Sequence, residues 1–201
     1  MIIEFLNEPF DHIIITDTFD EVEYDAVVAE LLFLQTNMSP PEHTGAAARG
    51  GIALKSGGGI MLQEFYKNIQ QSNVQKYTRK ICRNSNVWEA IAKNKSEMYY
   101  GLYTHLKNDS ILVQYYGDGD FYNPHEDACV FSAVTVLHDD PKKFSGGDLV
   151  FPDFGYNPTL RNNQTIIFPS ILTHAVEPLR VEEGSSGLCG RFSITNFMGF
   201  L

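Results

Sequence analysis

Two histidines and one aspartate in the second half of the chain have the residue types and the spacing of a metal site. His125 and Asp127 form a His-x-Asp pair directly after Pro124, and His174 follows 49 positions after His125 in a strand-like stretch. In an extended strand, residues i and i+2 point to the same side, so an imidazole and a carboxylate can reach one metal ion while Glu126 points away. These three side chains are therefore the candidate ligands of one ion.

Two histidines and one carboxylate on one face of an octahedral ion form the facial triad of non-haem Fe(II) oxygenases. Such a triad leaves coordination positions for a 2-oxo acid and for O2. Arg191, in GRFSITNF, has a planar guanidinium that matches a carboxylate bidentately, so it is the candidate anchor for the far carboxylate of the 2-oxo acid. Arg161, in the probable turn NPTLRNN, is the rival anchor, although a turn positions a side chain less rigidly than a strand does.

Several linked segments resemble the prolyl 4-hydroxylase-like branch of the 2-oxoglutarate/Fe(II)-dependent dioxygenase superfamily. The segment YGDGDFYNPHED resembles the family pattern Y-x-x-G-x-x-Y-x-P-H-x-D. Further matches, in the family's order, are SGGDLVFP (145–152), FPSILTHAVEPL (168–179) and RFSITNF (191–197), with a looser match at LKSGGGIMLQEFYKN (54–68). The resemblance covers most of the chain and is strongest from 111 to 198.

The resemblance implies a role for each matching residue. The implied iron ligands, which are also the catalytic centre, are His125, Asp127 and His174. Arg191 would bind the C5 carboxylate of 2-oxoglutarate, and Tyr116 would donate a hydroxyl hydrogen bond to that carboxylate or to its neighbour. Thr173 and Tyr122 would line the site.

Arg191 follows His174 by 17 positions, which is longer than is usual for the family. We expect the extra residues, VEEGSSGLCG, to form a turn between two paired strands.

The implied reaction is the hydroxylation of a C–H bond coupled to the conversion of 2-oxoglutarate and O2 into succinate and CO2. The implied cofactors are Fe(II), 2-oxoglutarate and O2, with ascorbate as a candidate reductant. A peptidyl substrate, with proline as one candidate, fits the branch that the chain resembles. A free amino acid or another small molecule is the alternative, and a non-enzymatic, metal-binding cupin-like module is a third hypothesis. The last has no need of Tyr116 and Arg191.

A second His-x-Asp pair, His138 and Asp140, lies before Pro141. It lacks the preceding tyrosine and glycine pattern, so we interpret it as the polar end of a strand. His12, His43 and His105 fit no motif and are interpreted as surface or core-edge residues.

The elements that must position these residues indicate a mainly β protein with N-terminal helices. From Ile111 onward, short β-rich runs are separated by Gly, Pro, Asn and Asp, which favours a sandwich or jelly-roll over a parallel sheet. With the resemblance, this predicts a double-stranded β-helix, a cupin-like barrel. The expected single domain spans 1–201, with helical support over about 1–108 and the jelly-roll core over about 109–201.

The N-terminal half is predicted to begin with a strand over 13–15 and a helix after Asp20, where Asp20 and Glu23 have the spacing of a capping box. A second amphipathic helix is predicted over 62–69, and a third helical region over about 86–105. Residues 37–59 are rich in Gly, Pro and Ala. They form either a flexible surface loop or a lid over an active site.

Composition narrows the choice of partners and location. The formal charge of −10 and the pI near 4.9 argue against nucleic acid or an anionic membrane as the main partner. No run approaches the roughly 18 apolar residues that cross a bilayer, and the acidic N-terminus is unlike a signal peptide. The three cysteines are odd in number and include no Cys-x-x-Cys pair, so we expect reduced thiols and a cytoplasmic protein. The oligomeric state cannot be read from the sequence.

Overall fold

One seven-stranded antiparallel sheet forms the centre of the molecule. The computed structural model describes residues 1–44, 48–82, 84–94, 96–139 and 141–200. In spatial order the strands of this main sheet are β1 (Ile2–Leu6), β2 (His12–Thr16), β11 (Gln164–Pro169), β8 (Phe131–His138), β14 (Arg191–Gly199), β6 (Asn108–Tyr116) and β5 (Gly58–Met61). The sheet therefore combines strands from both halves of the chain.

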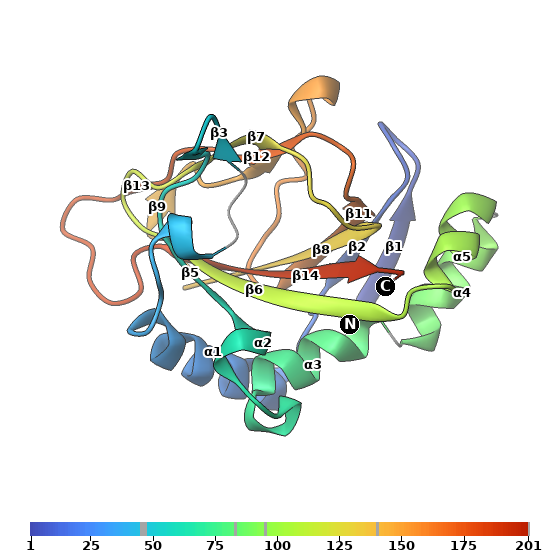
Figure 1. Cartoon of the computed structure of the whole chain (residues 1–201), viewed down its shortest axis with the longest axis horizontal. Helices are drawn as coiled ribbons and strands as arrows, with labels where there is room; N and C mark the ends of the chain where they lie inside the picture. The colour runs from blue at the N-terminus through green and yellow to red at the C-terminus, as the bar shows by residue number, and fades with distance from the viewer. Residues whose placement is uncertain (45–47, 83, 95, 140, 201) are drawn as a thin grey trace.

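A smaller sheet covers one face of the main sheet (Figure 1). Its strands, in spatial order, are β10 (Leu149–Val150), β12 (His174–Val176) and β7 (Tyr122–His125). Two short pairs accompany it, β13 (Arg180–Val181) with β9 (Phe144–Ser145), and β3 (Ala48–Arg49) with β4 (Ile52–Ala53). Val134 and Phe168 of the main sheet pack in one buried cluster with Leu149 and Val176 of the small sheet. The space between the two sheets is thus the place where inward-facing polar residues can meet.

Helices cover the opposite face of the main sheet. Figure 1 shows α1 (Glu21–Gln35), α2 (Leu62–Phe65) and α3 (Asn73–Cys82) below the sheet, with α4 (Ser85–Lys93) and α5 (Glu97–Tyr103) at one end. Single turns of 3-10 helix occur at η1 (Pro41–His43), η2 (Ile69–Gln71) and η3 (Pro152–Phe154). Leu31 and Leu34 of α1 pack with Phe192 and Ile194 of β14 in one buried cluster.

Alternation along β14 sends Ser193 and Thr195 away from the helices and towards the space between the sheets. Phe192 and Ile194 pack against the helices, while Ser193 and Thr195 line the cavity between the sheets. Arg191 has the same parity as Ser193, so it lies on the cavity side of the sheet.

The predicted strand over 13–15 is confirmed as β2, and the first helix begins where expected. The Asp20 side chain accepts from the backbone N–H of Glu23, as an N-cap should. The carboxylate of Glu23 contacts Lys80 of α3 instead.

The second predicted helix is wrong in length, because α2 ends after one turn and Tyr66 is already extended. The sequence pattern also missed α3 as a separate helix.

The expected turn between paired strands before Arg191 is also wrong. β14 pairs with β6 and β8, whereas β13, which precedes the long connection, pairs with β9. The connection over 182–190 therefore joins strands of two different sheets. His174 and Arg191 are each held by the register of their own sheet, and the length of the connection does not set their relative positions.

Membrane-spanning helices are lacking among the described residues: each helix there is too short or too polar to cross a bilayer.

Candidate metal centre and adjoining cavity

The small sheet brings His125 and His174 face to face. The two residues are register partners of the antiparallel pair β7 and β12, and their ring centroids lie 4.3 Å apart. Asp127 follows the end of β7, where its backbone N–H donates to the carbonyl of Ser170. The potential ligand atoms of the three side chains all lie within 4.8 Å of one another, a spacing at which they could hold one metal ion.

Hydrogen bonds to the backbone assign which ring nitrogen of each histidine faces the centre. Nδ1 of His125 lies 2.8 Å from the carbonyl oxygen of Asn123, and Nδ1 of His174 lies 2.8 Å from that of Leu172. Each Nδ1–H therefore donates to a carbonyl, and each Nε2 keeps a lone pair for a metal. The Nε2 atoms lie 3.9 Å and 3.4 Å from the Asp127 carboxylate.

The titration states of His125 and Asp127 suit metal ligation. Burial, together with the nearby His174, lowers the pKa of His125 to about 4, despite the raising effect of its bond to Asn123. His125 is therefore neutral near pH 7 and able to donate its lone pair. Burial alone would raise the pKa of Asp127, but the nearby His174 and the hydrogen bond from Ser132 outweigh it and lower that pKa.

Ser132 of β8 holds the Asp127 carboxylate, and sequence reasoning missed it. Its hydroxyl donates to Oδ2 of Asp127 at 2.5 Å and lies 3.0 Å from the hydroxyl of Ser170. The Ser170 hydroxyl in turn lies 2.8 Å from the sulfur of Cys129. A serine in the middle of an apolar strand was the only signal in the sequence, and it does not reveal which carboxylate the serine meets.

Arg191 is buried, and no ion pair holds it within the part of the chain that the structure describes. Its side chain is 2% exposed, and its Nε and Nη2 atoms have no hydrogen-bond partner among the described residues. The guanidinium lies 5.2 Å from the ring centroid of Tyr116, its register partner on β6. A buried guanidinium without an acceptor carries a large desolvation cost, so this fork fits an incoming carboxylate.

Tyr116 is buried beside Arg191 and lines the cavity between the sheets. Burial raises the pKa of Tyr116, although the nearby Arg191 acts in the opposite direction. The phenol therefore keeps its proton and can donate a hydrogen bond.

A cavity of about 670 Å³ joins the triad to this part of the barrel. His125, Asp127 and His174 line it together with Tyr116 and Tyr122. The Tyr122 ring stacks on the His125 ring, with centroids 3.5 Å apart and an interplanar angle of 14°. The structure thus brings together the three predicted ligands, both predicted tyrosines and the inward-facing Arg191.

Two other residues from the sequence argument lie elsewhere. Thr173 is half-buried just before β12 and does not line the cavity, because its neighbour His174 takes the inward position. Arg161 is exposed.

His138 ends β8 with its Nδ1 bonded to the carbonyl of Asp139, and Asp140 lies outside the described residues. Of the remaining histidines, His12 is fully buried, so the interpretation as a surface or core-edge residue is wrong there.

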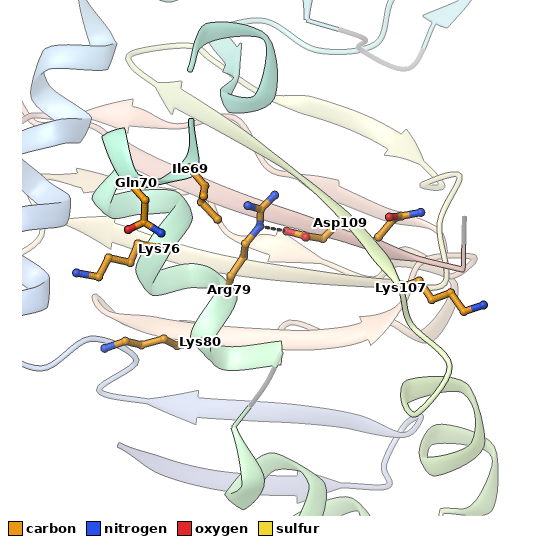
Figure 2. A pocket seen from close by; sticks show the side chains of 8 residues that line it. Ile69, Gln70, Lys76, Arg79, Lys80, Lys107 and Asp109 are labelled. Atoms are coloured by element: carbon orange, nitrogen blue, oxygen red, sulfur yellow. Dashed lines mark hydrogen bonds and ion pairs between the residues drawn. The ribbon is translucent and has the colours of Figure 1, made fainter. Parts of the chain in front are cut away.

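A second pocket, of about 560 Å³, lies outside the barrel between α3 and the start of β6. Figure 2 shows Arg79 reaching Asp109, a contact of 2.7 Å. Lysines surround this pair, and the triad is the one group of three metal-ligating side chains among the described residues. The pocket in Figure 2 therefore offers no comparable chemistry.

Comparison with known proteins agrees with this geometry. Residues 111–199 match the family model of the 2OG-Fe(II) oxygenase superfamily. The match spans all three triad residues, Tyr116 and Arg191. Among curated proteins, no sequence matches the chain significantly.

Solved structures share the fold at low sequence identity. A prolyl-4-hydroxylase from Pseudomonas putida is 17% identical, with a TM-score of 0.61 over 94% of this chain and 91% of its own. A Trichoplax adhaerens prolyl hydroxylase, solved with a peptide fragment of the hypoxia inducible factor oxygen degradation domain, is 15% identical, with a TM-score of 0.64 over 94% and 83%. A 2OG-Fe(II) oxygenase family oxidoreductase from Burkholderia pseudomallei is 14% identical, with a TM-score of 0.55 over 94% and 85%.

These findings confirm the predicted double-stranded β-helix, which prolyl hydroxylases share, and the family model confirms the predicted resemblance to the 2-oxoglutarate/Fe(II) dioxygenase superfamily over residues 111–199. The substrate is a separate question, because a shared fold does not imply a shared substrate.

Proposed function

We propose that this chain, whose residues 111–199 match the 2OG-Fe(II) oxygenase superfamily, is an iron- and 2-oxoglutarate-dependent dioxygenase that hydroxylates a peptidyl residue. One observation carries the proposal. The triad lines the cavity between the sheets, and Tyr116 lines the same cavity beside the buried Arg191, whose Nε and Nη2 atoms have no hydrogen-bond partner among the described residues. A metal-binding module without catalysis would need the first feature only, so the second favours the enzyme.

Each residue of the site has a defined task in this proposal. His125, Asp127 and His174 hold Fe(II), which when bound supplies the oxidising chemistry with O2 and 2-oxoglutarate. Arg191 binds the far carboxylate of 2-oxoglutarate, and Tyr116 donates a hydrogen bond beside it. The two packed sheets exclude water from the reacting groups.

The peptidyl substrate is supported by the neighbours in structure. Two of them are prolyl hydroxylases, and one of these holds a peptide. Proline is accordingly the first residue to test. Ascorbate is the reductant to include in the assay.

A free amino acid or other small molecule is the alternative substrate, and the size of the cavity favours it. About 670 Å³ falls within the range of small-molecule sites, roughly 300–1,000 Å³. A mass-spectrometric screen of proline-containing peptides and free amino acids for products that gain one oxygen distinguishes the two classes.

The proposed activity is tested by Fe(II)-dependent release of succinate from 2-oxoglutarate. We expect the wild-type protein to release succinate, and His125→Ala, Asp127→Ala and His174→Ala each to abolish the release, since each removes an iron ligand. His105→Ala, at an exposed histidine outside the cavity, is the control and should behave as wild type. Iron-loaded wild-type protein that releases no succinate in the presence of candidate substrates would refute the proposal.

A further inference from the structure

Lys55 is a second buried cation beside the candidate metal centre. Backbone hydrogen bonds join Ser56 to Phe121 and Asn123 to Leu54, so residues 54–56 lie alongside the strand that leads to His125. Lys55 itself forms an antiparallel bridge with Tyr122. Residues directly opposite each other in such a bridge point to the same side, which places the Lys55 side chain with the inward-facing Tyr122.

The ammonium group of Lys55 is buried and lacks a hydrogen-bond acceptor within the described part of the chain. The residue is 4% exposed, and its Nζ atom has no hydrogen-bond partner among the described residues. Nζ lies over the Tyr122 ring, 5.4 Å from its centroid. An aromatic face attracts a cation, but it does not replace the hydrogen bonds that the ammonium loses on leaving water. Such a group is retained at a cost in stability unless a ligand supplies an acceptor.

Lys55 lies near enough to the triad for their charges to interact. Asp127 raises the pKa of Lys55, although burial is the larger effect and brings it to about 8. Lys55 in turn is one of the groups that lower the pKa of His125. The cation is therefore part of the electrostatic surroundings of the metal centre.

The co-substrate does not account for this charge in the proposed function. The two charges of Fe(II) are offset by Asp127 and by the carboxylate of 2-oxoglutarate that binds near the metal, and Arg191 is offset by the far carboxylate. Arg191 belongs to the main sheet, whereas Lys55 lies beside the small sheet. Lys55 is then a buried cation for which the triad and the co-substrate supply no hydrogen-bonded anion among the described residues.

We propose that Lys55 binds a carboxylate of the substrate, so that the enzyme selects substrates that carry a negative charge close to the atom that is hydroxylated. This inference rests on the proposed function and narrows its substrate class. The carboxylate has two possible sources, the side chain of an acidic residue in a peptide and the α-carboxylate of a free amino acid.

The test compares the binding of matched probes to protein loaded with Ni(II) and 2-oxoglutarate, measured by calorimetry. The peptide probes are two pools of capped, proline-centred pentapeptides. The first pool carries aspartate or glutamate, and the second carries asparagine or glutamine at the same positions and is otherwise identical. The second probe pair consists of free amino acids and their amides. In at least one pair we expect the probe with the carboxylate to bind wild-type protein about tenfold to a hundredfold more tightly, as for a charge-assisted hydrogen bond. The pair that shows the preference identifies the source.

Variants then assign the preference to Lys55. Lys55→Met should remove it, and Lys55→Arg should largely retain it. Lys67→Met, at an exposed lysine outside the cavity, is the charge-matched control and should keep it in full.

Two results would overturn the proposal. In the first, wild-type protein binds the charged and neutral probes equally, or binds none of them, a result that does not require any variant to fold. In the second, Lys55→Met weakens the binding of 2-oxoglutarate itself, which would assign the cation to the co-substrate. The failure of the proposed function is seen separately, as absence of Fe(II)-dependent succinate release.

Discussion

At the scale of single residues, the candidate metal centre is held by hydrogen bonds that come from the backbone and from one serine. The backbone fixes both imidazoles through Nδ1, and Ser132 fixes one oxygen of Asp127. Partners of this kind orient a ligand and commonly change metal affinity by 10–100-fold when they are removed.

Ser132→Ala should weaken metal binding by about 10–100-fold, because the Asp127 carboxylate loses the donor that holds its Oδ2 atom. Titration of the purified protein with Co(II) or Ni(II) measures the affinity directly. Ser145→Ala, at an exposed position of β9, is the matched control. Equal affinities in Ser132→Ala and wild type would show that the serine does not support the ligand.

Arg191→Ala should raise the KM for 2-oxoglutarate by about tenfold or more, since a charge-assisted bidentate contact is lost from a part of the molecule that does not react. Steady-state kinetics at saturating iron provides the measurement. Arg161→Ala serves as the comparison, because that arginine is exposed. The reverse pattern, with the loss in Arg161→Ala alone, would show that the wrong arginine was chosen.

At the scale of elements, the strand β2 begins with a buried imidazole. His12 is fully buried, and its Nδ1 lies 2.8 Å from the carbonyl oxygen of Phe10 while its Nε2 lies 3.0 Å from the hydroxyl of Tyr156. Burial lowers the pKa of His12, although the bond to Phe10 and the nearby Asp11 act in the opposite direction. The structure therefore favours the neutral form.

His12 should make the protein less stable in mild acid. Because the folded pKa lies below the ordinary histidine value of 6.5, the unfolded chain binds more protons, and the free energy of unfolding falls as pH falls from about 6.5 towards the folded pKa. The contribution to the slope is at most about 1.4 kcal/mol per pH unit. Urea unfolding of the metal-free protein at pH values from about 5 to 7 measures this pH dependence.

In His12→Gln this part of the slope should disappear, whereas His105→Gln, at an exposed ring, should leave it in place. An identical pH dependence in wild type and His12→Gln would contradict the assignment.

The elements also show why parts of the sequence prediction failed. The apolar spacing from Leu62 to Ile69 suited a continuous helix, yet Tyr66 is extended and the helix ends. Tyr66 is partly buried against the apolar cluster that joins α1 to β14. Tertiary packing therefore outweighs a weak local preference for helix. A periodic pattern does not contain that information.

At the scale of the whole molecule, the jelly-roll and its three candidate ligands could be predicted because they depend on short, local patterns. A His-x-Asp pair lies within one short segment, and β-rich runs separated by turn residues can be recognised directly in the sequence. The relation between distant segments is different. Lys55 reaches Tyr122 only through a pairing between a loop and a strand that no local pattern specifies.

Sheet pairing also explains how a chain with a long connection before Arg191 keeps its site intact. β14 lies between β6 and β8 along its length, so the position of Arg191 follows from the main sheet. The triad histidines follow from the small sheet. The cavity forms where the two sheets pack, which makes the site a property of the complete barrel.

The central claim is that this barrel uses O2 and 2-oxoglutarate at His125, Asp127 and His174. The most direct measurement is turnover of 2-oxoglutarate by the Fe(II)-loaded protein under ¹⁸O2, with mass analysis of the succinate. The account predicts succinate that carries one oxygen atom from O2, and none of it from His125→Ala, Asp127→Ala or His174→Ala. Succinate without the label, or labelled succinate from a protein that lacks one of the three ligands, would contradict it.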